Sequence, residues 1–212
     1  MQMKALIPYK KKNAKSRLSP ALSVREREHF VELMLRDVVG SLRGAGISDI
    51  DILTTPSNGV PNDLGTNILF SEYDLNEAIN QYLETISEPV LIIMADLPLV
   101  SPGHIKEITS TDKDLVIVPG KGGGTNVLFI RNPRKFYVSY YNSSFLNHCR
   151  IAEEMKQSTH IFDSFLLSTD IDEPHDLIEI MLHGHGLSKV YVDSKFGMEG
   201  NGKSRARLEM LQ

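Results

Sequence analysis

The chain has little cysteine and no long apolar run. It contains one cysteine, Cys149, in 212 residues, which excludes an internal disulfide framework and makes a reducing, cytoplasmic compartment the expected location. No run of apolar residues approaches the length of a membrane span, and the N-terminal residues are too polar for a signal peptide. We therefore expect no membrane partner.

A strong charge of one sign is also lacking. The net charge is −4, from 23 basic and 27 acidic residues, which argues against a general nucleic-acid binder. The contents of 41% hydrophobic and 24% charged residues are typical of a globular protein and exclude a disordered one. We expect one domain over residues 1–212, with the tail from about residue 197 loosely held.

Two common nucleotide-binding motifs are missing. No complete G-x-G-x-x-G follows the first strand pattern, and no G-x-x-x-x-G-K-[ST] occurs, so neither a dinucleotide-binding Rossmann domain nor a P-loop enzyme is expected. The seven histidines are scattered. His183 and His185 bracket a glycine but have no further candidate ligands nearby, so a zinc site is not expected.

Strand and helix patterns alternate along the rest of the chain. Residues 90–94 are an unbroken apolar run, which is typical of a strand buried on both faces. Extended segments are predicted at 5–7, 50–54, 90–94, 115–118, 127–130 and 162–168. Helices are predicted at 24–43, 75–86, 144–155 and 176–182, with another beginning at the cap Ser101-Pro102. This alternation predicts a three-layer α/β sandwich with a mostly parallel sheet.

A basic segment follows the first predicted strand. Before the first acidic residue, Glu26, the chain carries seven basic ones: Lys4, Lys10, Lys11, Lys12, Lys15, Arg17 and Arg25. A basic cluster is often only a solvated arm. Open α/β sheets, however, bind ligands at the carboxyl ends of their strands, so the same segment is a candidate anion site.

Two acidic segments also follow predicted extended runs. Asp96 comes just after the strand 90–94, and Asp170 and Asp172 come just after 162–168. Asp96 alone would suit a turn before Pro98, and Asp172 alone would suit a helix cap. Carboxylates brought together from two strand ends would suit Mg²⁺, which binds through one or two carboxylates and substrate phosphate oxygens.

Five motifs occur in order over most of the chain: the loop 8–18 with Lys10 and the run Ala14-Lys15-Ser16-Arg17-Leu18, and the segments 75–78 (LNEA), 95–98 (ADLP), 124–128 (GTNVL) and 170–174 (DIDEP). Together they resemble the 2-phospho-L-lactate guanylyltransferases of coenzyme F-420 biosynthesis. The resemblance implies a nucleotide-diphospho-sugar transferase (glycosyltransferase-A-like) fold, Mg²⁺ as cofactor, and GTP and 2-phospho-L-lactate as substrates.

The resemblance also implies residue roles. The metal ligands would be Asp96, Asp170 and Asp172. The catalytic residues would be Lys15, Arg17 and Asp96. Nucleotide binding falls to Lys10, Lys15, Arg17 and Asn76, and acceptor binding to Thr125 and Ser144. Tyr141 stands where the family often has the glycine of a G-x-x-S-F stretch.

Several alternatives stay open at this point. One is a related nucleotidyltransferase that uses CTP, or phosphoenolpyruvate as acceptor. Another is a nucleotide-sugar glycosyltransferase, because Asp170-Ile171-Asp172 imitates a D-x-D metal motif. A third is a non-catalytic nucleotide-binding protein. Neither the base, the acceptor nor the oligomeric state follows from the sequence, and a homodimer is among the options.

Overall fold

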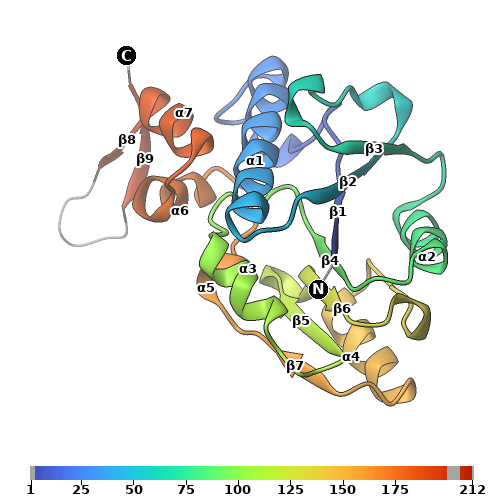
Figure 1. Ribbon diagram of the computed structural model, residues 1–212. Coiled ribbons are helices and arrows are strands. Elements are labelled where there is room, and N and C mark those ends of the chain that lie inside the picture. Colours follow the sequence, from blue (N-terminus) through green and yellow to red (C-terminus); the bar gives the residue numbers. More distant parts are fainter. Residues whose placement is uncertain (1–2, 200–205, 212) are drawn as a thin grey trace.

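The computed structural model describes residues 3–199 and 206–211, in which helices cover both faces of a seven-stranded sheet (Figure 1). The strands are β1 (Lys4–Pro8), β2 (Asp49–Thr54), β3 (Asn67–Phe70), β4 (Val90–Ile93), β5 (Leu115–Pro119), β6 (Thr125–Ile130) and β7 (Thr159–Ile161). Their order in the sheet is β3-β2-β1-β4-β6-β5-β7. Neighbouring strands are parallel except where β6 pairs with β4 and with β5. The predicted mostly parallel sheet is confirmed.

Two apolar layers separate the sheet from its helices. The helices are α1 (Val24–Gly44), α2 (Leu75–Thr85), α3 (Pro102–Thr109), α4 (Ser144–Glu154), α5 (Phe165–Ser168), α6 (Asp176–His183) and α7 (Leu187–Lys195). Along β1, Ala5 and Ile7 face the layer shared with α1 and α3, whereas Leu6 faces the layer shared with α2 and α4. This alternation gives the three-layer sandwich that the sequence predicts.

Local signals in the sequence account for where two of the helices begin. Ser23 and Glu26 form a reciprocal capping box at the start of α1, and Ser101 caps α3, whose first residue is Pro102. Such caps satisfy backbone N–H groups that the helix itself leaves free. Gly44 lets α1 approach α3, because a Cβ at this position would lie 2.7 Å from Cγ of Pro102.

The predicted extended run 162–168 is wrong over its second half, which forms α5, because the Ser164 side chain accepts a hydrogen bond from Leu167 N and starts a helical turn. In the tail, β8 (Phe196–Glu199) pairs with β9 (Arg207–Met210), while 200–205 lie outside the described residues. The single domain and the loosely held tail therefore stay predictions.

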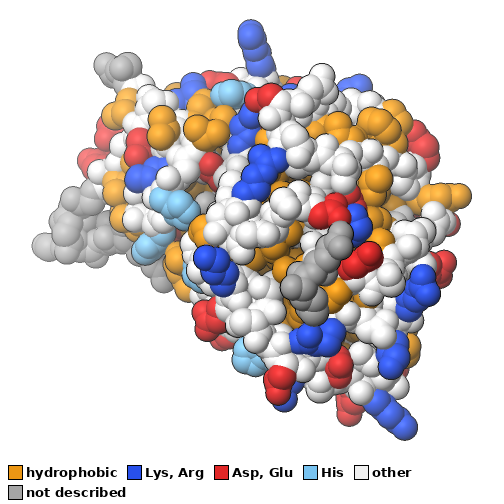
Figure 2. Space-filling model, in the orientation of Figure 1, with side chains coloured by type: hydrophobic (Ala, Val, Ile, Leu, Met, Phe, Trp, Pro, Cys, Tyr) orange, Lys and Arg blue, Asp and Glu red, His pale blue; other side chains and the backbone are white. Residues whose placement is uncertain are grey.

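The C-terminal elements α6, α7, β8 and β9 lie at one side of the molecule, next to α1 (Figure 1). On the face shown in Figure 2, basic and acidic side chains are interspersed. Among the helices of the described residues, none combines the length and apolar character that crossing a membrane requires.

Candidate functional site

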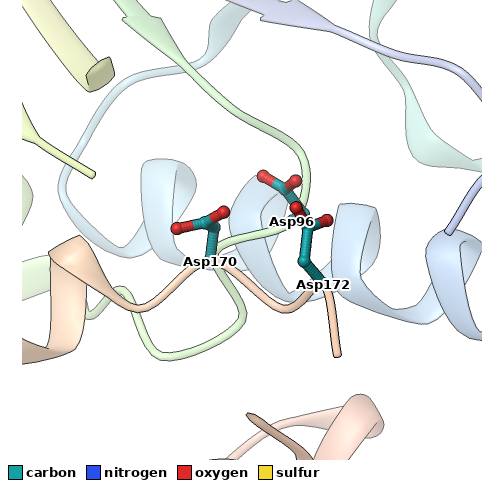
Figure 3. Close-up of side chains that lie close together, drawn as sticks. All are labelled: Asp96, Asp170 and Asp172. Atoms are coloured by element: carbon teal, nitrogen blue, oxygen red, sulfur yellow. The ribbon is translucent and has the colours of Figure 1, made fainter. Parts of the chain in front are cut away.

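Three carboxylates converge in a group that we call the acid cluster: Asp96, Asp170 and Asp172 (Figure 3). Each offers an oxygen atom, and these atoms all lie within 4.8 Å of one another. Asp96 follows β4, and the other two lie between α5 and α6. A hydrogen bond from Ile171 N to the Asp96 carbonyl oxygen, 3.1 Å long, fastens the two segments together. The structure thus assembles the three acids that the sequence predicts as one group.

The acid cluster carries excess negative charge, which favours the binding of a cation. The pKa of Asp170 is raised, first because burial penalises its charged form and then because Asp96 lies close. Oδ1 of Asp96 is buried and has no hydrogen-bond partner within residues 3–199 and 206–211. A buried carboxylate oxygen without a donor is costly unless something positive approaches it. The donor set, carboxylates alone, is the kind that hard divalent cations prefer.

Lys15 and Arg17 both reach the acid cluster. Nζ of Lys15 donates to Oδ1 of Asp172 at 2.6 Å and also to Oδ2 of Asp96. Burial by itself would lower the pKa of Lys15, but the attraction of Asp96 and Asp172 outweighs it and the pKa is raised. The guanidinium of Arg17 is 69% exposed and lies 3.1 Å from Oδ2 of Asp172, where a ligand can contact it from solvent.

Side chains from outside the basic segment hold it in place. The Asn58 side chain accepts hydrogen bonds from the backbone N–H groups of Lys11 and Lys12, each at 3.0 Å. Arg27, which is buried in α1, donates to the carbonyl oxygens of Leu22 and Ala14. The sequence did not predict the contacts of Asn58 and Arg27, because an asparagine in a loop and an arginine in a helix carry no signal of a distant partner.

A cavity of about 590 Å³ opens beside the basic segment. It is lined by Pro8, Tyr9, Lys10, Lys12, Asn13, Leu53, Thr54, Thr55, Ser57, Asn58, Ser71, Tyr73, Leu75, Ala78 and Tyr141. Lys10 and Lys12 are therefore wall residues, whereas Nζ of Lys11 pairs with Glu32 at 2.9 Å. The same loop continues from the wall residue Asn13 to Lys15, so it connects the cavity wall with the acid cluster.

Asn76, a predicted nucleotide-binding residue, lies next to the cavity at the start of α2. Its side chain accepts a hydrogen bond from Tyr140 N at 2.6 Å and donates one to the Tyr140 carbonyl oxygen at 3.2 Å. Both functions of the amide are thus engaged by one backbone unit. Asn76 therefore fixes the backbone position of Tyr140, the residue before Tyr141.

Thr125 and Ser144, the predicted acceptor-binding pair, lie side by side and are 4% exposed each. The Ser144 hydroxyl donates to Oγ1 of Thr125 at 3.2 Å, and Nδ1 of His148 lies 2.9 Å from the same oxygen. On its other side, the ring accepts a hydrogen bond from Ser139 N at Nε2. A neutral ring that accepts at Nε2 carries its proton on Nδ1 and so donates to Thr125. The sequence did not indicate a role for His148, because a single histidine in a helical segment carries no signal of its distant partners.

The acidic segment and β6 are shaped by neighbours that the sequence did not reveal. Asp176 accepts hydrogen bonds from the backbone of Asp172 and Glu173, at 3.0 and 2.8 Å, and pairs with Lys121. The N-cap of α6 is His175, so the alternative prediction that Asp172 caps this helix is wrong, and its carboxylate belongs to the acid cluster. At the start of β6, Asn126 donates to the Leu167 carbonyl oxygen at 2.8 Å and lies 3.4 Å from Asp170.

We expect His148 to make the stability of the protein depend on pH. Burial lowers the pKa of His148 to about 4, from an ordinary value of 6.5. Between these values the unfolded chain binds a proton at this ring that the folded chain does not, so the free energy of unfolding should fall as the pH falls from 6.5 to 4. The shift corresponds to a loss of roughly 3 kcal/mol.

Urea unfolding of the wild type and His148→Gln at pH 7 and pH 5 measures this effect. The difference between the two proteins isolates His148 from the other six histidines, and it should shrink at pH 5, because the wild type alone loses the contribution of this ring. An unchanged difference between the two pH values would contradict the prediction.

Comparisons with known proteins agree with one another. The family described as guanylyl transferase CofC like matches residues 3–211. The 2-phospho-L-lactate guanylyltransferase of Methanococcoides burtonii is 57% identical over 209 residues, 99% of this chain and 97% of that protein. The enzyme of the same name from Methanosarcina mazei is 60% identical over 197 residues, 93% of this chain and 95% of its own length.

A solved structure has the same fold. A protein from Desulfovibrio desulfuricans, assigned to the nucleotide-diphospho-sugar transferases, superposes with a TM-score of 0.71 over 91% of this chain and 94% of its own. Its sequence is only 13% identical, so the likeness concerns the fold alone. The fold class that the sequence predicts is confirmed.

Proposed function

Because the chain belongs to the CofC-like guanylyl transferase family, we propose that it joins GTP and 2-phospho-L-lactate to give lactyl-2-diphospho-5′-guanosine and pyrophosphate. The observation that carries this proposal is the convergence of the acid cluster with Lys15 and Arg17. A cavity of about 590 Å³, lined in part by Lys10 and Lys12 of the same loop, offers room for the nucleoside. The activity belongs to biosynthesis of coenzyme F-420, and the single free cysteine suits the cytoplasm.

The proposed reaction is a substitution at phosphorus. A phosphate oxygen of 2-phospho-L-lactate attacks the α-phosphorus of GTP, the bond from that phosphorus to the bridging oxygen breaks, and pyrophosphate leaves with the electron pair. The second pKa of such a phosphate is about 6, so the attacking oxygen is already deprotonated at neutral pH. No general base is therefore needed for the attack.

The main barrier is repulsion between anions. A triphosphate, a monophosphate and a carboxylate must approach one another, so positive charge and fixed positions are what the protein must supply. Lys15 and Arg17 would contact the triphosphate at the acid cluster, and Lys10 and Lys12 would contact its nucleoside end. Thr125 and Ser144 would orient the three-carbon acid.

Mg²⁺ is the metal ion we propose for the acid cluster. Asp96, Asp170 and Asp172 would hold it, and the buried, unpartnered Oδ1 of Asp96 and the raised pKa of Asp170 support this fit. When bound, the ion supplies positive charge that neutralises the phosphate oxygens.

Pyrophosphate release tests the proposed function. With Mg²⁺ present, we expect release to require both GTP and 2-phospho-L-lactate. Replacing GTP by CTP, or the acceptor by phosphoenolpyruvate, should lower the rate about tenfold or more, because the better substrate gains at least one additional contact in the transition state. Equal rates with CTP or with phosphoenolpyruvate would assign the chain to a related nucleotidyltransferase, and no release under any condition would contradict a catalytic function.

A further inference from the structure

Three consecutive residues next to the cavity adopt an unusual backbone conformation. Tyr141, Asn142 and Ser143 have φ angles of +73°, +46° and +63°. This left-handed region is costly for residues other than glycine, and most of all for a bulky one such as tyrosine. Strained backbone of this kind persists only where the surrounding structure enforces it, and it is concentrated at functional sites.

Two asparagines enforce this conformation. The side-chain amide of Asn147, in the first turn of α4, donates to the carbonyl oxygens of Tyr141 at 3.2 Å and Asn142 at 3.3 Å. From α2, Asn76 binds both the N–H and the carbonyl oxygen of Tyr140. The strained turn is thus held at both of its ends, by α2 and by α4.

The result of this arrangement is an aromatic ring exposed in the cavity. Tyr141 is 61% exposed and lines the cavity, and so is Tyr73, at 55%. The remaining wall combines apolar side chains, polar loop side chains and the basic residues Lys10 and Lys12. A concave site with exposed aromatic faces and nearby positive charge suits a planar, π-rich ligand that carries phosphate groups.

We propose that Tyr141 contacts the purine base of the nucleoside triphosphate by stacking, and that Asn147 and Asn76 are positioning residues that hold the tyrosine in the cavity. This inference rests on the proposed function, since it assigns the purine end of the same substrate. A purine has a larger face than a pyrimidine, so the contact favours GTP over CTP. The proposal also gives Asn76 a positioning role in place of a direct ligand contact, because both functions of its side-chain amide are already hydrogen-bonded to the backbone of Tyr140.

Equilibrium binding without the acceptor, and hence without turnover, tests the proposal. The ligands are GTP and, as a probe without a base, inorganic tripolyphosphate, both with Mg²⁺ and measured by calorimetry. Loss of stacking in Tyr141→Leu should weaken GTP binding about ten- to a hundredfold, while Tyr141→Phe, which keeps the ring, should bind nearly as the wild type does. Tyr137→Leu is the matched control, because Tyr137 is also exposed but does not line the cavity. Tripolyphosphate should bind all four proteins equally.

A second variant separates stacking from folding. Tyr141→Gly relieves the left-handed strain, so its Tm should equal or exceed that of the wild type, yet it should bind GTP as weakly as Tyr141→Leu. Asn147→Ala should weaken GTP binding without affecting tripolyphosphate. Unchanged GTP affinity in Tyr141→Leu, or an equal loss for GTP and tripolyphosphate, would overturn the role of Tyr141. No GTP binding by the wild type would instead overturn the proposed function itself.

Discussion

Asp96→Asn should lower the rate of GTP-dependent pyrophosphate release about a thousandfold, while the protein keeps its fold. Loss of metal-assisted charge neutralisation costs several kcal/mol in the transition state, and each 1.4 kcal/mol is about a factor of ten in rate. An amide fills nearly the same space as the carboxylate, but it is a poor ligand for Mg²⁺. The substitution also removes the negative charge that pairs with Lys15, and it removes the buried carboxylate oxygen, Oδ1, that we assign to the metal ion.

The measurement is turnover at saturating Mg²⁺, with circular dichroism and Tm as tests of the fold. Asp112→Asn is the matched control, because Asp112 is an exposed acid outside the acid cluster and its replacement should leave the rate unchanged. Asp170→Asn should resemble Asp96→Asn. Near-normal turnover in Asp96→Asn would show that the acid cluster is not the reaction centre.

Lys15→Met should impair the protein in two separable ways. Without metal, the ammonium group of Lys15 compensates Asp96 and Asp172, so removing it leaves partly buried carboxylates facing one another. Breaking such a set costs about 3–5 kcal/mol when it is fully buried. Because Asp172 is 37% exposed, we expect about 2 kcal/mol, which lowers the Tm by roughly 4–8 °C. Turnover should fall about a hundredfold, since a charged contact with phosphate is lost.

Adding a divalent cation distinguishes the two effects. Mg²⁺ or Mn²⁺ should restore much of the Tm of Lys15→Met, because the ion binds the folded acid cluster and compensates its charge, but it should not restore turnover. Lys11→Met, in the same loop, loses only the ion pair with Glu32 and should change neither the metal dependence nor the rate substantially. A Lys15→Met protein with wild-type Tm and rate would refute the contacts we assign to Lys15.

The parts of the site that the sequence predicts are carried by contiguous motifs, and two of these motifs lie at strand ends. Asp96 comes just after the apolar run 90–94, which is typical of a buried strand, and Lys15 lies in a loop rich in basic residues after β1. In both places the local pattern alone specifies the element and the edge of the sheet at which the side chain emerges. Asp170 and Asp172, by contrast, follow helix α5 rather than a strand, and the sequence predicts them through the segment 170–174 that resembles the family.

The parts that the sequence does not predict depend on distant contacts. The apolar run 127–130 in β6 indicates burial but not direction, and its antiparallel pairing with β4 depends on a partner that is distant in the sequence. Phe162–Ser168 is equally ambiguous, and a single cap at Ser164 decides for helix in its second half. The left-handed turn at Tyr141 is set by Asn147 and Asn76, whose partners are invisible without the fold.

The reversed direction of β6 has a consequence for how the site is connected. Residues 120–124 form a short turn that leaves β5 and enters β6 at the same edge of the sheet. A parallel neighbour would need a crossover of a dozen or more residues to return to that edge. Because the entropy lost on closing a loop grows with its length, the hairpin places Asn126 beside Asp170 of the acid cluster at a small entropic cost. The site therefore combines Asp96, which follows the C-terminal end of β4, with Asn126, which lies at the N-terminal start of β6.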